Sequence, residues 1–300
     1  MFIEQLKNKN FQAILYLPIP LCFLGLIVVN YIMSQGVDVN ELMHKTIEQF
    51  GSNLTFFLSV VPLSVGCLVI WFWVKFVHCQ SITSLTTSRK SIDWSRIFFS
   101  FGLWTFVSLV LTGIGYYFAP ENFVMNFNLV PFLIFFFMAI ILLPLQTSFE
   151  EYLFRGYILQ GLGIITNSRL IAFLTTSILF GLMHWANPEV EKLGPIMMVY
   201  YIGTGFLLGI MTLMDEGLEL ALGFHAANNL IGALLVTSDW GALQTNSVLK
   251  DISVPSGGFE IAMPVILIYP IIIFIFSKKY GWKNWSQKLF GKLNSESFIN

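Results

Sequence analysis

Residues 129–155 read LVPFLIFFFMAIILLPLQTSFEEYLFR, and this stretch decides how the chain folds. Its segment 129–149 contains no charged side chain. A helix needs about 20 predominantly apolar residues to cross a hydrocarbon core about 30 Å thick. The stretch therefore predicts a membrane-spanning helix over 129–149, followed directly by two adjacent carboxylates, Glu150 and Glu151.

The rest of the chain has the same character, since 56% of its 300 residues are hydrophobic and only 11% are charged. With a mean hydropathy of +0.73, this composition excludes a soluble globular protein. We predict a single all-α domain over residues 1–300, a bundle of eight transmembrane helices in a lipid bilayer. The predicted spans are 13–33, 54–77, 97–119, 129–149, 170–186, 195–214, 219–237 and 259–277.

The positive charges predict the orientation of this bundle. In an eight-span arrangement all lysines and arginines but three fall on the side of the two termini, the exceptions being Lys45, Lys192 and Lys250. Cytoplasmic loops carry the excess of positive charge, so both termini are predicted to be cytoplasmic. The net charge of −1, without a basic stripe, gives no indication of a nucleic-acid partner.

Ionisable side chains inside membrane spans are energetically costly, so each one suggests a function and needs a partner. Glu151 and Arg155 are four residues apart, on one helical face, in the favourable order for an ion pair. We interpret them as a supporting structural pair. Glu150 points elsewhere and must find its partner on another helix.

Two histidines in otherwise apolar segments can supply that partner. His184 follows Phe180 by one helical turn, and His225 precedes Asn229 by one turn, although Asn228 could replace Asn229 if the helix is locally unwound. Polar side chains at such positions must be satisfied internally or by water. We therefore expect Glu150, His184, His225 and Asn229 to gather in one polar cluster.

This set of side chains suits hydrolysis. A carboxylate beside an imidazole can take a proton from water, while a second imidazole and an amide can stabilise the oxyanion that forms when water attacks a carbonyl. The same set could bind Zn²⁺, with Glu150, His184 and His225 as possible ligands. The residues leave both mechanisms open, and the chain lacks the His-Glu-x-x-His helix of many zinc proteases.

Three motifs occur in order: Glu-Glu-x-x-x-Arg at 150–155, Phe-x-x-x-His at 180–184 and His-x-x-x-Asn at 225–229. Together they resemble the CAAX protease and bacteriocin-processing (CPBP) family, which includes the type II CAAX prenyl endopeptidases. The motif-bearing core covers about 130–237. Residues 1–128 carry no signature.

The resemblance implies an intramembrane endopeptidase whose site opens toward the cytosol, most naturally in the plasma membrane of a bacterium. By that analogy Glu150 and His184 activate the water, and His225 and Asn229 form the oxyanion hole. The implied substrate is a membrane-tethered peptide or a prenylated, CAAX-like tail. The family is described both with a metal and with a metal-free glutamate mechanism.

Two other functions compete with proteolysis. A non-catalytic member of the same fold could act as an immunity or regulatory protein that binds a peptide. A small-molecule transporter would also place charges inside the membrane, but transporters commonly show two related halves. Here the charged motifs are confined to 150–229.

Depth sets a condition on the predicted cluster. His184 lies about 14 residues into its span, roughly 21 Å along the helix axis, whereas Glu150 directly follows the span 129–149. The two can meet only if the fourth helix continues to about residue 160. Glu150, Glu151 and Arg155 are then carried well into the membrane.

Overall fold

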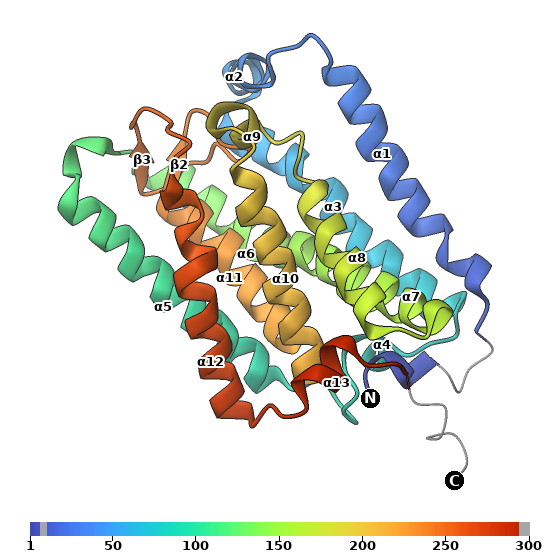
Figure 1. The fold of residues 1–300 in the computed structure, drawn as a ribbon. Coiled ribbons are helices and arrows are strands. Elements are labelled where there is room, and N and C mark those ends of the chain that lie inside the picture. The colour runs from blue at the N-terminus through green and yellow to red at the C-terminus, as the bar shows by residue number, and fades with distance from the viewer. Residues whose placement is uncertain (7–10, 294–300) are drawn as a thin grey trace.

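The structure is a computed structural model, and it describes residues 1–6 and 11–293. Long helices run alongside one another and form a bundle (Figure 1). The helices of the bundle are α1 (Pro18–Ser34), α3 (Ser52–Phe76), α5 (Trp94–Phe118), α6 (Leu129–Glu151), α7 (Leu159–Thr166), α8 (Arg169–Leu182), α10 (Met197–Asp215), α11 (Glu219–Leu235) and α12 (Tyr269–Tyr280). Short helices α2 (Val39–Phe50), α4 (Ile82–Thr86), α9 (Pro188–Leu193) and α13 (Trp285–Phe290) lie at the two ends.

Within the described residues, six helical stretches are long and apolar enough to cross a membrane. They are Ala13–Met33, Ser52–Phe76, Trp94–Phe118, Leu129–Thr166, Met197–Asp215 and Phe259–Tyr280. The helices α8 and α11 correspond to the predicted fifth and seventh spans but are shorter. The prediction of an all-α polytopic membrane protein is confirmed, while the count of eight spans and the cytoplasmic termini stay predictions.

The fourth apolar stretch does not end at residue 149. It continues through a π-helical segment η4 (Tyr152–Ile158) into α7, so that Leu129–Thr166 forms one helical stretch of 38 residues. At 1.5 Å per residue this is about 57 Å, well beyond the thickness of a hydrocarbon core. The condition that this stretch continues to about residue 160 is therefore met. The predicted end of the span at residue 149 was wrong because the charged residues that follow it are buried inside the bundle.

A small three-stranded sheet at one end of the bundle was not predicted. Strand β3 (Leu249–Asp251) pairs antiparallel with β1 (Phe123–Met125) and parallel with β2 (Val236–Ser238). Because β2 directly follows α11 and β1 shortly precedes α6, the sheet connects the ends of these two helices. It lies at the same end as α2 and α9 (Figure 1).

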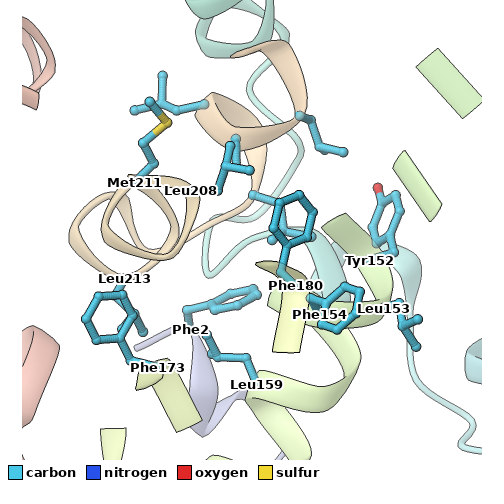
Figure 2. Packing of buried hydrophobic residues seen from close by; sticks show 14 of the residues in the cluster. Phe2, Tyr152, Leu153, Phe154, Leu159, Phe173, Phe180, Leu208, Met211 and Leu213 are labelled. Carbon is cyan, nitrogen blue, oxygen red and sulfur yellow. The ribbon is translucent and has the colours of Figure 1, made fainter. Parts of the chain in front are cut away.

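The main apolar core lies where η4, α7, α8 and α10 meet. Figure 2 shows Phe2, from the N-terminal segment, in the same cluster of buried residues as Leu159, Phe173 and Leu208. All four side chains are buried. The N-terminal segment is further fixed by Arg169, whose Nη2 lies 2.7 Å from the Glu4 carboxylate. The start of α8 and the N-terminal segment are therefore held together.

Asp215, at the end of α10, connects three parts of the chain at the end that carries α4 and α13. Its Oδ2 lies 2.9 Å from Arg89 Nη2, and its Oδ1 accepts hydrogen bonds from Arg96 and, at 3.1 Å, from the indole of Trp282. Asp215 is buried. This ionic tie around Asp215 joins the segment before α5 and the first turn of α5 to the α10–α11 turn and the segment after α12.

Gly223 allows α5 and α11 to approach closely, as small residues do in membrane helix pairs. A Cβ atom at Gly223 would lie 2.1 Å from the carbonyl oxygen of Ile97. Only glycine fits at this distance. Since α11 carries His225 and Asn229, this contact also sets how deeply the site residues sit in the bundle.

Gly223→Ala is therefore expected to lower the free energy of unfolding by about 1–3 kcal/mol, the usual cost of overpacking. Thermal unfolding of the purified protein followed by circular dichroism measures the effect. Gly113→Ala in α5 is the matched control, because nothing lies within 4 Å of a Cβ atom there. Equal midpoints for the two variants would contradict the close approach.

Candidate active site

The helical stretch Leu129–Thr166, made of α6, η4 and α7, carries three ionisable side chains into the bundle. Glu150 is 3% exposed, and Glu151 and Arg155 are fully buried. Arg155 Nη1 lies 3.0 Å from Glu151 Oε1, as predicted for residues four apart on one helical face. Arg155 also donates through Nη2 to the carbonyl of Gly205 on α10, at 3.1 Å. The predicted ion pair is confirmed.

His225 joins the two carboxylates. Its Nδ1 lies 2.8 Å from Glu151 Oε1, and its Nε2 lies 3.9 Å from Glu150 Oε2. An ionised carboxylate can only accept, so Nδ1 carries the proton and donates to Glu151. The Nε2 atom therefore faces Glu150.

His184 is held in a similar way by a different acceptor. Its Nδ1 lies 2.8 Å from the carbonyl oxygen of Phe180, which requires a proton on Nδ1 and leaves Nε2 unprotonated in the neutral ring. The ring stacks on Tyr201, with centroids 4.4 Å apart and planes inclined by 14°. His184 is half-buried, and within the described chain no hydrogen bond or ion pair joins it to Glu150.

Phe180 lies between the two histidines. Its ring centroid is 5.1 Å from that of His184 and 5.6 Å from that of His225, and the Arg155 guanidinium lies 4.0 Å from the centroid. Figure 2 shows Phe180 next to Phe154, and their ring centroids lie 5.7 Å apart. The Phe-x-x-x-His motif thus places an apolar ring against the buried cation and between both imidazoles.

Asn229 reaches Glu150 through a residue that the sequence analysis missed. Asn229 Nδ2 donates to Gln146 Oε1 at 3.1 Å, and Gln146 Nε2 donates to Glu150 Oε1. Gln146 is a single amide in an otherwise apolar helix, one turn before Glu150, and this position could have indicated that it contacts Glu150. Tyr201, the ring beneath His184, had no comparable signal because it stands next to Tyr200 in an aromatic run.

The predicted cluster is therefore assembled in part. His225 and, through Gln146, Asn229 are joined to Glu150. His184 instead contacts the ring of Phe180, which in turn contacts His225. Glu150 Oε2 is buried and accepts no hydrogen bond from the residues that the structure describes. It is the carboxylate oxygen that faces His225 Nε2.

Zn²⁺ fits these residues only incompletely. Each histidine anchors its Nδ1 and leaves Nε2 available, which is typical of zinc ligands. However, residues 1–6 and 11–293 contain no group of three or more His, Cys, Asp or Glu side chains arranged to bind a metal ion. In the arrangement seen here, Glu150, His184 and His225 do not form the predicted ligand set.

Glu189 on α9 lies outside the spans, two residues after Asn187, whose Nδ2 donates to the Tyr201 hydroxyl at 3.3 Å. Burial raises the pKa of Glu189, although its Oε1 accepts a 2.7 Å hydrogen bond from the backbone N–H of Ala242. A raised pKa in the folded state means that ionised Glu189 lowers stability at neutral pH. That cost disappears as the pH falls through the raised pKa.

Glu189→Gln is therefore expected to raise the thermal unfolding midpoint at pH 7, because the amide keeps an acceptor without burying a charge. The gain should shrink on acidification and vanish below about pH 4.5, where wild-type Glu189 is neutral in both states. Unfolding midpoints of both proteins between pH 4 and 8 measure this. A gain that is independent of pH would contradict it.

The protein is thus a polytopic membrane protein. Among its apolar helices one buried carboxylate is bonded to an amide and faces an imidazole, an arrangement suited to acid–base chemistry. Residues 126–231 match the family described as type II CAAX prenyl endopeptidase Rce1-like. Residues 126–231 are therefore an Rce1-like domain, which confirms the resemblance predicted from the three motifs. The match contains Glu150, His184, His225 and Asn229.

The chain is also similar to a protein of Bacillus subtilis (strain 168), the uncharacterized protein YyaK. The two are 28% identical over 212 residues, which cover 70% of this chain and 69% of YyaK. No solved structure is significantly similar to this chain. The chain is thus an integral membrane protein, and its residues 126–231 match the Rce1-like family.

Proposed function

We propose that this protein is an intramembrane endopeptidase that hydrolyses a peptide bond of a membrane-associated substrate. The observation that supports it most directly is the way in which the two carboxylate oxygens of Glu150 are bonded. One carboxylate oxygen is held by Gln146, and the other is buried, unbonded within the described chain and 3.9 Å from His225 Nε2. A carboxylate held in this way has one oxygen ready to accept a proton.

In the proposed reaction Glu150 Oε2 takes a proton from water, assisted by the unprotonated Nε2 of His184. The hydroxide attacks the carbonyl carbon of the substrate, and the carbonyl oxygen becomes an oxyanion. When the tetrahedral intermediate collapses, the C–N bond breaks and Glu150 returns the proton to the leaving amine. Each step uses side chains only, so no step requires a metal.

The oxyanion needs N–H donors fixed in place before the reaction. Asn229 has a second N–H besides the one bonded to Gln146. A doubly protonated His225 would offer Nε2–H, and the Glu151 carboxylate at Nδ1 would balance its charge. The pair Glu151–Arg155 thus supports the site through His225 rather than by touching substrate.

The substrate class follows from the family and from the place of the site. A peptide bond can reach a carboxylate buried among apolar helices only if its chain enters the membrane region, so a membrane-tethered peptide or a prenylated, CAAX-like tail is the proposed substrate. We place the protein in the plasma membrane of a bacterium, with the site opening toward the cytosol.

The test uses purified full-length protein in phospholipid vesicles and an internally quenched, farnesylated peptide that ends in a CAAX sequence. We expect a rise in fluorescence, and mass spectrometry of the products locates the cleaved bond. The same peptide without the farnesyl group is the control for membrane tethering. If neither peptide is cleaved, this form of the proposal is wrong, and the result favours a non-catalytic protein that binds a peptide.

Removal of metal separates the two mechanisms left open by the sequence. Because the side chains around Glu150 do not form a three-ligand set, we expect cleavage to continue after dialysis against a chelator. Elemental analysis of the same sample checks that metal has been removed. A stoichiometric metal that is lost together with activity, and restores activity when returned, would show that the residues rearrange into a metal site.

A further inference from the structure

A continuous row of side-chain hydrogen bonds leads from α5 to Glu150. It begins at Trp104, whose indole Nε1–H donates to Asn228 Oδ1 at 3.0 Å. The hydroxyl of Tyr200 on α10 donates to the same oxygen at 3.4 Å. Asn228 Nδ2 then donates to the neighbouring Asn229 Oδ1 at 3.1 Å. Three helices thus meet at one amide.

The row continues from Asn229 Nδ2 to Gln146 Oε1 and from Gln146 Nε2 to Glu150 Oε1. Trp104, Gln146 and Glu150 are each buried to more than nine-tenths, with exposures of 5%, 8% and 3%. Every amide in the row uses its oxygen toward α5 and its nitrogen toward Glu150. We call Trp104, Asn228, Asn229 and Gln146 the amide relay.

Both ends of the amide relay require this direction. The two ends of an amide are nearly the same in size, so hydrogen-bond partners decide which way the group points. An indole N–H can only donate, which turns the Asn228 oxygen toward Trp104. At the other end Gln146 Nε2 donates to Glu150 Oε1, and a carboxylate in its ionised, proton-accepting state can only accept. Asn229, between them, has only one orientation that satisfies both neighbours.

That orientation matters for the proposed chemistry. An oxyanion hole needs N–H groups, and an Asn229 amide turned by 180° would present a carbonyl oxygen to a negative charge instead. Nothing in the size of the side chain prevents such a flip. The donors at Trp104 and Tyr200 and the acceptor at Glu150 prevent it.

We propose that Trp104, Asn228 and Gln146 are positioning residues, which fix the Asn229 amide with its N–H groups toward the reacting centre and hold Glu150 by one oxygen. The catalytic consequence rests on the proposed endopeptidase function. The coupling along the amide relay does not, because it is a property of the folded protein. The two can therefore be tested separately.

The first experiment needs no substrate. Full-length protein in lipid nanodiscs, labelled with ¹⁵N at the tryptophan indoles, gives one N–H resonance for each tryptophan, and Trp104→Phe identifies the one from Trp104. Hydrogen bonds in a row polarise one another. Glu150→Gln is therefore expected to shift the Trp104 resonance, and the same change in a Gln146→Leu background is expected to leave it in place.

The reference in these spectra is Trp73, whose indole donates to Leu15 at 3.2 Å, outside the amide relay. Its resonance should be the same in all variants. If Glu150→Gln leaves the Trp104 resonance unmoved, or moves it equally with and without Gln146, the amide relay is overturned.

The second experiment measures kcat and KM with the quenched farnesylated peptide. Trp104→Phe keeps an aromatic ring beside Phe224 and removes the N–H donor together with part of the ring volume. Since loss of a whole oxyanion-hole donor costs about 10²–10³ in kcat, loss of its orientation is expected to lower kcat on the order of tenfold with KM unchanged.

Ser100→Ala is the matched control, because it also removes one buried hydrogen bond between α5 and α11, from Ser100 to the Leu220 carbonyl at 2.7 Å. Equal kcat values for Ser100→Ala and Trp104→Phe would overturn the positioning role. If instead Glu150→Gln retains full activity, the endopeptidase mechanism fails, and the resonance of Trp104 still decides whether the relay exists.

Discussion

Glu150→Gln is expected to lower the rate of peptide cleavage by about 10²–10⁴-fold, the usual contribution of a positioned general base. The amide has nearly the same shape as the carboxylate and can still accept from Gln146 through its oxygen. It cannot take a proton from water. The initial rate with the quenched farnesylated peptide, at equal amounts of folded protein, gives the result.

The control for this substitution is Glu4→Gln, which removes another buried carboxylate. Glu4 pairs with Arg169 at the start of α8, away from the site. Its loss is expected to reduce stability and to leave the rate per folded molecule unchanged. If Glu150→Gln cleaved the peptide as fast as Glu4→Gln, water would be activated by another group.

Arg155→Met has the largest expected effect on stability, a loss of about 3–5 kcal/mol in the free energy of unfolding. The substitution leaves the fully buried Glu151 carboxylate with His225 as its remaining partner and frees the carbonyl of Gly205. An unpaired buried charge is more costly than the absence of the whole pair. Unfolding in mixed micelles of increasing sodium dodecyl sulfate content measures the loss.

Two comparisons sharpen this prediction. The double variant Arg155→Met with Glu151→Gln should be more stable than Arg155→Met alone, because no unpaired carboxylate is left. Lys45→Met removes a Glu41–Lys45 pair with the same four-residue spacing but exposed side chains, and should cost at most about 0.5 kcal/mol. Equal losses for Arg155→Met and Lys45→Met would contradict the importance of burial.

The sequence was sufficient for those parts of the fold that depend on composition and spacing. A run such as 129–149 predicts a membrane helix whatever its neighbours are, and a Glu–Arg spacing of four predicts an ion pair on any helix. The depth of His184 in its span even predicted that the fourth helix must continue past Glu150. These arguments need only distances along one helix.

Contacts between helices were harder to predict, for a physical reason. A helix that is apolar on every side gives no sign of which face turns inward, so its rotation is set by packing alone. The bond from Asn229 to Gln146 and the stacking of Tyr201 on His184 depend on that rotation. The π-helical segment η4 depends on it too, and three-residue strands are too short to form a recognisable pattern.

The ionic tie around Asp215 has a consequence for the order in which the protein matures. Translation produces Arg89 and Arg96 before Asp215, but Trp282 only after the whole of α12 has been synthesised. The α10–α11 turn, which leads directly into the helix of His225 and Asn229, therefore acquires its full set of bonds only when synthesis is almost finished. A nascent chain that ends before Trp282 lacks the last of these bonds, at the turn that leads into the helix of His225 and Asn229.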